Sequence, residues 1–434
     1  MCFSIMFMLD LTLLFAFSLS AHRIVAAANR SIAAHYNITD HVLNLTVHDY
    51  RAELLRKREF PLPAGHEDLV NIKNRLHLAT VLIGDKVFAL AIDTNSSTTW
   101  VADSSFVCLE YHNVDQGPAR CNLGREFRPS SSKTLKPLGA KVTSRYYNGM
   151  FIEGNFVEEH IGIGGVSRAL PYFRKIRQII GVAEKGYWNG HGVASGVLGL
   201  GFQYEQDPFS VIQAVFKDRS SLNIFSLALK RASSPEPTAG GVLAFGGVPN
   251  NIPTDNHWAE TPILPRSPET PEGYRIKIDG FDIRPPPGAP EPDTEPGGPY
   301  KSDDTIMVVD SSTSTVIVPP EVALYTASLF RTGGKLYSPY NKYLVPCIAP
   351  APRVGIVISG KSYYISDADL RSPAPELGDN VCVLELEPAD KGRLVLGDVW
   401  LRNVLAVFDF TDRVERRRPE YANGVLRIAG REFY

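Results

Sequence analysis

A short motif occurs twice in this chain, and the same tripeptide follows each copy downstream. Ala91 to Ser97 reads AIDTNSS, and Val308 to Ser314 reads VVDSSTS. The tripeptide Val-Leu-Gly follows at Val197 to Gly199 and again at Val395 to Gly397. Two copies of one pattern imply two related lobes built on the same plan. We expect the lobes to join near the turn-rich segment around Pro249 to Pro265.

The runs between these motifs are short, apolar or alternating, and rich in Val, Ile and Phe, with Gly, Pro, Asn and Ser between them. Such runs have the length and composition of strands rather than helices. Helical periodicity is scarce, and the best short candidate is Pro208 to Phe216. The predicted fold class is therefore all-β or mainly β. Examples of predicted strands are Leu78–Ile83, Val87–Ile92, Phe225–Leu229, Val242–Phe245 and Val354–Ile358.

Length and charge exclude several classes of function. The 434 residues suit two or three domains or one large bilobal fold. With 45 Lys and Arg against 47 Asp and Glu, the chain has no basic footprint for nucleic acid. The histidines show no metal-ligand spacing, and the glycine-rich stretch at 162–165 lacks the third glycine of a dinucleotide fingerprint. We therefore expect neither a metal nor a cofactor.

The N-terminal 28 residues predict a signal peptide that is cleaved. Their apolar run, Leu11 to Ala21, is too short to span a bilayer comfortably, and the small residues at 26–28 suit cleavage. A membrane anchor is the alternative, because Asp10 and the lack of a basic residue before the run are atypical of signals. After cleavage we expect no stable membrane insertion.

The cysteine count supports export. Cys2 would leave with the signal, and an even set of four cysteines would remain at positions 108, 121, 347 and 382. An even set in a secreted chain predicts two disulfides formed in an oxidising compartment. Four buried free thiols are the alternative if the chain is not exported.

A polar stretch from residue 29 to residue 72 predicts a leader or prosegment. It holds glycosylation sequons at Asn29, Asn37 and Asn44 and a basic run, Arg56 to Arg58. Much later, Pro285 to Pro299 contains seven prolines and three glycines, which predicts an exposed loop within the second lobe. The predicted divisions are a signal at 1–28, a prosegment at 29–72, an N-terminal lobe at 73–255 and a C-terminal lobe at 256–434.

Each copy of the repeated motif carries an acid directly after an apolar strand and before small hydroxyl residues. The acids are Asp93 and Asp310. This order can bury a carboxylate at the end of a strand, where hydroxyls and backbone N–H groups hydrogen-bond it. A single Asp-Ser/Thr turn is usually only a cap or an Asx-turn. The paired motif with its paired Val-Leu-Gly carries much more weight.

These motifs resemble those of the pepsin-like aspartic proteases, and more narrowly of their secreted fungal members. The resemblance covers about Leu76 to Arg413, most of the chain after the leader. The further shared motifs are Trp100-Val101, the Cys108 to Cys121 loop, Phe127 to Ser132, Tyr146 to Gly149, Tyr187 to Gly190, Gly196 to Leu200, Gly246 to Val248, Leu396 to Asn403 and Val407 to Asp409.

The resemblance implies a bilobal fold with a central cleft, where Asp93 and Asp310 meet across the lobe interface. Two carboxylates about 3 Å apart cannot both ionise cheaply, so they share one proton. The ionised acid would act as general base on a water, and the protonated acid would polarise the scissile carbonyl and then protonate the leaving amine. The resemblance further implies polypeptide substrates in an extended cleft and a monomer.

The resemblance also assigns supporting roles. Ser96 and Thr313 would hydrogen-bond the outer oxygens of the two carboxylates, while Thr94 and Ser311 would tie the two loops together. Tyr146 would lie on a flap hairpin with its hydroxyl directed at Trp100, although either ring alone would be ordinary core. The implied disulfides are Cys108 with Cys121 and Cys347 with Cys382.

The chain departs from the family at the third position of each loop, where Asn95 and Ser312 replace glycine. A side chain in a glycine-only conformation costs about 1 to 3 kcal/mol, and in an ordinary conformation it would crowd the water. Asn95 also begins a sequon, which we expect to be unoccupied. Tyr147 replaces a small residue after the flap tyrosine, and the tail from Val414 ends differently, with a charge run at 416–418 that we interpret as solvated.

Two functions follow from this pattern. The first is a secreted, acid-active aspartic endopeptidase, supported by both acids, the four neighbouring hydroxyls and the aromatic pair of the flap. The second is a catalytically impaired pseudoenzyme that keeps the fold and binds peptides or another protein. Asn95 and Ser312 motivate the second hypothesis, and the retained acids favour the first.

Overall fold

The structure is a computed structural model of the 434-residue chain. The predicted signal peptide, the basic run at 56–58, most of the proline-rich loop and the charge run at 416–418 lie outside the described residues. The structure describes residues 42–49, 75–109, 121–163, 174–190, 192–202, 210–217, 223–231, 238–248, 252–265, 273–289, 301–331, 333–389, 392–410 and 423–431.

Strands dominate both halves of the described chain. The first half holds β1 (Val42–Asp49), β2 (Arg75–Ile83), β3 (Lys86–Asp93), β4 (Trp100–Cys108), β5 (Lys136–Arg145), β6 (Phe151–Ile163), β7 (Arg174–Tyr187), β8 (Gly196–Gly199), β9 (Ile224–Leu229) and β10 (Thr238–Phe245). The second half holds β11 (Trp258–Pro262), β12 (Tyr274–Arg284), β13 (Lys301–Val309), β14 (Val316–Val318), β15 (Lys335–Tyr337), β16 (Lys342–Pro346), β17 (Arg353–Ile358), β18 (Lys361–Ile365), β19 (Arg371–Pro373), β20 (Val381–Leu384), β21 (Leu386–Pro388), β22 (Val395–Leu396), β23 (Val404–Asp409) and β24 (Val425–Gly430). The short helices are α3 (Val211–Phe216), α4 (Pro320–Ser328), α5 (Asp367–Leu370) and α6 (Asp398–Leu401).

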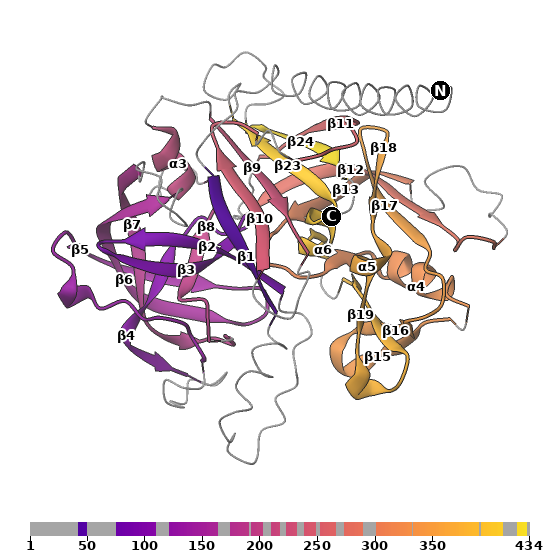
Figure 1. Cartoon of the computed structure of the whole chain (residues 1–434), viewed down its shortest axis with the longest axis horizontal. Coiled ribbons are helices and arrows are strands. Elements are labelled where there is room, and N and C mark those ends of the chain that lie inside the picture. Colours follow the sequence, from indigo (N-terminus) through magenta and orange to yellow (C-terminus); the bar gives the residue numbers. More distant parts are fainter. Residues whose placement is uncertain are drawn as a thin grey trace, which may run out of the picture.

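One long sheet joins the two halves of the chain (Figure 1). Its order is β11-β24-β23-β9-β10-β1-β2-β3-β8-β4-β7-β6-β5, so strands from both ends of the sequence meet in it. The second half adds a seven-stranded sheet, β18-β17-β12-β13-β22-β14-β21, and a four-stranded sheet, β15-β16-β20-β19. The mainly β, bilobal architecture expected from the sequence is confirmed.

The repeated motif occupies equivalent places in the two lobes. In the first, β3 runs parallel to β8, and Asp93 lies beside Gly199. In the second, β13 runs parallel to β22, and Val309 lies beside Leu396. Each acid therefore stands at the end of a strand whose parallel neighbour carries the Val-Leu-Gly tripeptide.

The five strands named as examples from the sequence all lie within observed strands. The predicted helix is shorter than expected in the described part of the chain, because Ser210 caps it and forms a reciprocal capping box with Gln213. The turn-rich segment around residues 249–265 contains a strand, β11, whose burial alternates and which pairs with β24. Pairing with the C-terminal strand thus overrides the local turn composition.

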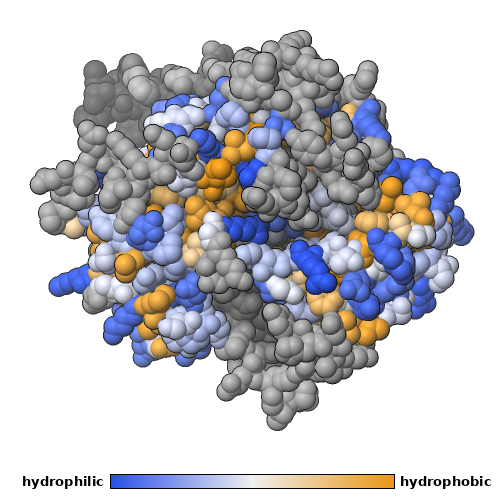
Figure 2. Space-filling model, turned by 180° about the vertical axis from the view of Figure 1, so that it is seen from behind, coloured by the Kyte–Doolittle hydropathy of each residue, from blue (hydrophilic) through white to orange (hydrophobic). Residues whose placement is uncertain are grey.

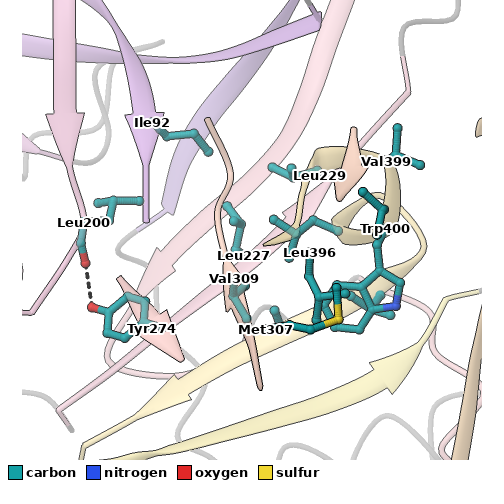
Figure 3. Packing of buried hydrophobic residues seen from close by; sticks show 14 of the residues in the cluster. Ile92, Leu200, Leu227, Leu229, Tyr274, Met307, Val309, Leu396, Val399 and Trp400 are labelled. Carbon is teal, nitrogen blue, oxygen red and sulfur yellow. Dashed lines mark hydrogen bonds between the residues drawn. The ribbon is translucent and has the colours of Figure 1, made fainter. Parts of the chain in front are cut away.

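A continuous apolar core lies beneath the meeting point of the two halves. Figure 3 shows Ile92 from β3, Val309 from β13 and Leu396 from β22 close to one another. Tyr274 of β12 donates its hydroxyl to the carbonyl of Leu200 at 2.6 Å, which links the second half to the loop after β8. Burying a large apolar side chain contributes roughly 1.5–3 kcal/mol, so this core stabilises the packing of the strands that carry the two acids.

Two disulfides close loops, one within a second, smaller core cluster and one at the edge of the main core. Cys108 bonds to Cys121, and Cys347 bonds to Cys382, as the resemblance implied. No helix among the described residues is long and apolar enough to cross a membrane. On the face shown in Figure 2, polar residues surround several small groups of hydrophobic ones.

Candidate active site

Reciprocal hydrogen bonds join the two acid-bearing loops. The backbone N–H of Thr94 donates to the Ser311 hydroxyl at 3.1 Å, and the backbone N–H of Ser311 donates to the Thr94 hydroxyl at 3.0 Å. Each hydroxyl also donates across the pair, from Thr94 to the Val309 carbonyl at 2.8 Å and from Ser311 to the Ile92 carbonyl at 3.1 Å. These four bonds connect the residues that flank Asp93 to those that flank Asp310.

Both carboxylates are buried and held by the turns that follow them. Asp93 is 1% exposed, and its Oδ1 accepts the backbone N–H groups of Asn95 at 2.8 Å and Ser96 at 3.1 Å. Asp310 is 2% exposed, and its Oδ1 accepts the Ser312 backbone N–H at 2.9 Å and the Ser312 hydroxyl at 2.7 Å. The turn therefore satisfies one oxygen of each carboxylate, which fixes the plane of the acid.

The second oxygen of Asp310 accepts its hydrogen bond from a different residue. Its Oδ2 accepts the Thr313 hydroxyl at 2.9 Å, the bond that the resemblance implied. On the first loop, Ser96 reaches Asp93 through its backbone N–H, and the role expected for its side chain stays a prediction.

The two residues that replace glycine adopt ordinary backbone conformations. Neither Asn95 nor Ser312 is among the described non-glycine residues with positive φ, so the backbone strain considered for these positions is absent. A Cβ on Gly273 would come within 2.4 Å of Asn95 Oδ1, so the Asn95 carboxamide lies against the bare backbone of Gly273. The missing side chain at Gly273 thus makes room for the extra side chain at Asn95.

A hairpin of β5 and β6 carries the predicted flap tyrosine. Trp100 is fully buried at the start of β4, and its indole N–H donates to the Tyr146 hydroxyl at 2.7 Å. Trp188 packs edge-on against both rings, with centroids 4.9 Å from Trp100 and 5.1 Å from Tyr146. The three rings fix the turn end of the flap hairpin to the first lobe.

An arginine that sequence reasoning missed stands next to Asp310. The Nη2 atom of Arg393 lies 3.5 Å from Asp310 Oδ2, and the guanidinium carbon lies 5.2 Å from the centroid of the Tyr147 ring. The position precedes a Val-Leu-Gly motif that was recognised, but no local pattern around residue 393 signals a role. Only the parallel pairing of β13 with β22 reveals it.

A buried ionic cluster joins residues from the two halves of the chain. Arg402 Nε lies 2.8 Å from Asp369 Oδ1, and Arg231, from the first half of the chain, donates to the same carboxylate. Burial opposes ionisation of Asp369, but the charges of Arg402 and Arg231 with hydrogen bonds from Arg231 and Ser366 outweigh it and lower the pKa of Asp369 to about 2. Burial acts against the charged form of Arg402 too, yet the neighbouring carboxylates, Asp398 first, raise its pKa.

The carboxylates of Asp93 and Asp310 are thus held in two loops that hydrogen-bond to each other, and aromatic rings anchor the flap hairpin of the first lobe. Carboxylates held this way suit general acid and base chemistry on water. Among the described residues, no group of three or more His, Cys, Asp or Glu side chains could hold a metal ion.

Comparison with known proteins matches this description. The family model for eukaryotic aspartyl proteases matches residues 77–415. A protein of Aspergillus fumigatus named as a probable aspartic-type endopeptidase is 27% identical over 369 residues, which cover 80% of this chain and 79% of that protein. Secreted aspartic protease 4 of Candida albicans is 24% identical, over 77% of this chain and 74% of its own, and cathepsin E of Rattus norvegicus is 26% identical, over 79% and 80%. The chain, with its pepsin-like fold, belongs to the eukaryotic aspartyl protease family.

Proposed function

We propose that this protein is an active, secreted aspartic endopeptidase in which Asp93 and Asp310 activate a water molecule. The observation that carries the proposal is the set of reciprocal hydrogen bonds between Thr94 and Ser311, which connects the two acid-bearing loops. Burial of both acids at this joint supports a shared proton, because two adjacent carboxylates in a dry site do not both ionise.

The proposed reaction needs only these two side chains and a water. The ionised acid removes a proton from the water, whose oxygen attacks the carbonyl carbon of the scissile peptide bond. The protonated acid donates a hydrogen bond to the carbonyl oxygen. The bond to nitrogen then breaks as the leaving amine takes a proton, and the two carboxyl groups again hold one proton between them. Substrates are polypeptides bound in an extended form beneath the flap.

Export and processing are parts of the same proposal. Residues 1–28 act as the signal, residues 29–72 as a prosegment, and the lobes comprise 73–255 and 256–434. The name of the Candida albicans relative, secreted aspartic protease 4, and the two disulfides support an extracellular location. N-terminal sequencing of the protein from culture medium tests both cleavages, and an intact residue 1 on the extracellular protein would contradict them.

The pseudoenzyme remains the second candidate, because Asn95 and Ser312 stand where the family has glycine. Two observations count against it. The Asn95 carboxamide lies against Gly273, and the Ser312 hydroxyl donates to Asp310 rather than disrupting its hydrogen bonds. Peptide binding without cleavage by the processed protein would favour this candidate.

The deciding experiment measures cleavage of a denatured protein by the processed protein from strongly acid to neutral pH. We expect cleavage at acid pH that a pepstatin-type inhibitor blocks, and a loss of about 10²- to 10⁴-fold in Asp93→Asn and Asp310→Asn. Asp85→Asn, on the exposed turn between β2 and β3, is the matched control and keeps full activity. Inactive wild type that Asn95→Gly with Ser312→Gly activates would overturn the proposal in favour of the pseudoenzyme.

A further inference from the structure

A cation stands between the candidate catalytic acids and the flap. Arg393 precedes β22, and the carbonyl of the next residue, Leu394, accepts the backbone N–H of Val308 at 2.9 Å. This pairing fixes the arginine three residues before Leu396, which faces Val309 at the end of β13. The guanidinium then lies 3.5 Å from Asp310 Oδ2, and the side chain stays 27% exposed.

The contact with Asp310 leaves most of the guanidinium available. At 3.5 Å it is longer than an ordinary hydrogen bond between nitrogen and oxygen, and the same Oδ2 already accepts the Thr313 hydroxyl at 2.9 Å. A guanidinium has five N–H donors. Within the part of the chain that the structure describes, its other partner is the face of the Tyr147 ring. Arg393 is therefore not needed to orient Asp310.

The ring of Tyr147 holds the Arg393 guanidinium in one position before any ligand binds. The guanidinium carbon lies 5.2 Å from the centroid of the ring, within the range of a cation–π contact. The ring itself is 51% exposed on the flap turn, so no other part of the fold requires an aromatic residue there. An arginine stacked in this way loses less conformational freedom when it binds a ligand.

We infer that Arg393 is a specificity-determining residue that binds an acidic side chain of the substrate next to the scissile bond. The inference rests on the proposed function, because it requires a peptide between the flap and the two acids. A scissile carbonyl within hydrogen-bond reach of Asp310 brings the residues on either side of the bond within a few ångströms of the guanidinium, since an extended chain advances about 3.3 Å per residue. Carboxylates are the groups that a guanidinium binds best, through two parallel hydrogen bonds.

Charge at the site supports the same preference. A pair of acids that shares one proton carries a net negative charge, which repels a second carboxylate brought beside it. Arg393 offsets that charge, and it adds an attractive partner on the flap side. Substrates with Glu beside the scissile bond should therefore be favoured in the wild type and disfavoured once the cation is removed.

The test uses fluorogenic peptides in matched Glu and Gln pairs, one pair for each of the two positions on either side of the scissile bond. At pH 5.5 we expect kcat/KM to be about tenfold higher for Glu at one of these positions, the size of one charge-assisted hydrogen bond. Arg393→Gln should remove or reverse the preference for Glu. Arg393→Lys, which keeps the positive charge but lacks the two parallel N–H donors of a guanidinium, should retain part of it. Because free Glu titrates near pH 4.3, the wild-type preference for Glu should vanish by about pH 3, where the substrate Glu is protonated. Arg393→Gln should show no such change with pH.

The outcomes separate this inference from the proposed function. Asp93-dependent cleavage of the Gln peptides with the same Glu-to-Gln ratio in wild type and Arg393→Gln would overturn the role of Arg393 and leave the endopeptidase intact. If no peptide is cleaved, the affinities of uncleavable Glu and Gln analogues, with a reduced scissile bond, give the answer by calorimetry. A Glu preference that Arg393→Gln abolishes would support the binding role without catalysis, and equal affinities would overturn it.

Discussion

At the scale of single residues, the site shows how the protein accommodates a side chain at a position where the family has glycine. Asn95 fits because Gly273, on the other half of the chain, lacks a Cβ that would meet Asn95 Oδ1 at 2.4 Å. The two residues should therefore be energetically coupled, although they lie far apart in the sequence.

This coupling is testable with a double-mutant cycle on the free energy of unfolding. Gly273→Ala should destabilise the protein by about 1–3 kcal/mol, since its Cβ meets Asn95 and Val308 at a positive φ of 84°. In an Asn95→Gly background the same substitution should cost at least about 0.5 kcal/mol less, because one of the two clashes is gone. Denaturant unfolding measures both, and strictly additive effects would show that the carboxamide does not occupy this space.

The same geometry bears on glycosylation of Asn95. Its carboxamide oxygen packs against Gly273, its backbone N–H donates to Asp93, and its side chain is only partly exposed, so a glycan on Nδ2 would have little room beside the two loops. We expect mass spectrometry of tryptic peptides from the secreted protein to find Asn95 unmodified. A substantial fraction of peptides with a glycan at this residue would contradict the packing.

At the scale of elements, the flap hairpin depends on one buried donor. The indole N–H of Trp100 points to the Tyr146 hydroxyl at 2.7 Å, and Trp100 is fully buried. Tyr146→Phe leaves that donor unsatisfied, which costs about 1–3 kcal/mol and should lower kcat/KM by about 5- to 100-fold. Tyr147→Phe, one residue further along the turn, keeps its ring and serves as the control.

A second substitution distinguishes the hydrogen bond from the loss of the hydroxyl itself. Adding Trp100→Phe to Tyr146→Phe removes both partners, so no polar group is left buried without a partner. The double variant should therefore recover part of the activity lost by Tyr146→Phe. A double variant worse than the sum of the two single variants would mean that the hydroxyl acts on the substrate and not on the tryptophan.

The ionic cluster between α5, α6 and the loop after β9 should make stability depend on pH at the acid end. Asp369 has a pKa of about 2 in the folded protein and about 3.9 when unfolded. The ionised carboxylate therefore stabilises the fold fully above about pH 5, and this contribution falls as the pH drops through 4 towards 2. At pH 4 and above, Asp369 therefore keeps most of its charge.

Urea unfolding of Asp369→Asn between pH 2 and pH 6 measures this contribution. The Asp93→Asn background prevents self-digestion during the measurement. The wild type should exceed the variant by roughly 2–3 kcal/mol from linkage alone at pH 5, and the gap should narrow steadily below pH 4. Asp85→Asn, with its exposed side chain, should follow the wild type. A gap that stays constant down to pH 2 would mean that Asp369 titrates normally.

At the scale of the whole molecule, some features could be predicted from the sequence and others could not. The acids and their hydroxyls were found because each lies within seven consecutive residues that occur twice. Arg393 and Gly273 were missed because their importance arises from contacts between strands that are distant in sequence. The strand β11 was missed for the same reason, since its turn-rich composition is overridden by pairing with β24.

The predicted prosegment contributes to the central sheet, which could not be foreseen from its polar composition. Strand β1, at Val42–Asp49, pairs with β10 on one side and β2 on the other. It thus bridges two strands that would otherwise each present an open edge. Open edges expose unpaired backbone groups and promote association between molecules.

A chain secreted without residues 29–72 should therefore reach the medium in lower soluble yield and aggregate more readily than the full chain. A synthetic peptide of residues 41–50, added during refolding, should recover part of the yield because it can pair with β2 and β10 again. The matched control lacks only residues 29–40 and retains all of β1, so it should behave like the full chain. Light scattering and soluble yield after refolding measure the effect. Equal yields for all three chains would mean that the residues after position 72 close the sheet without β1.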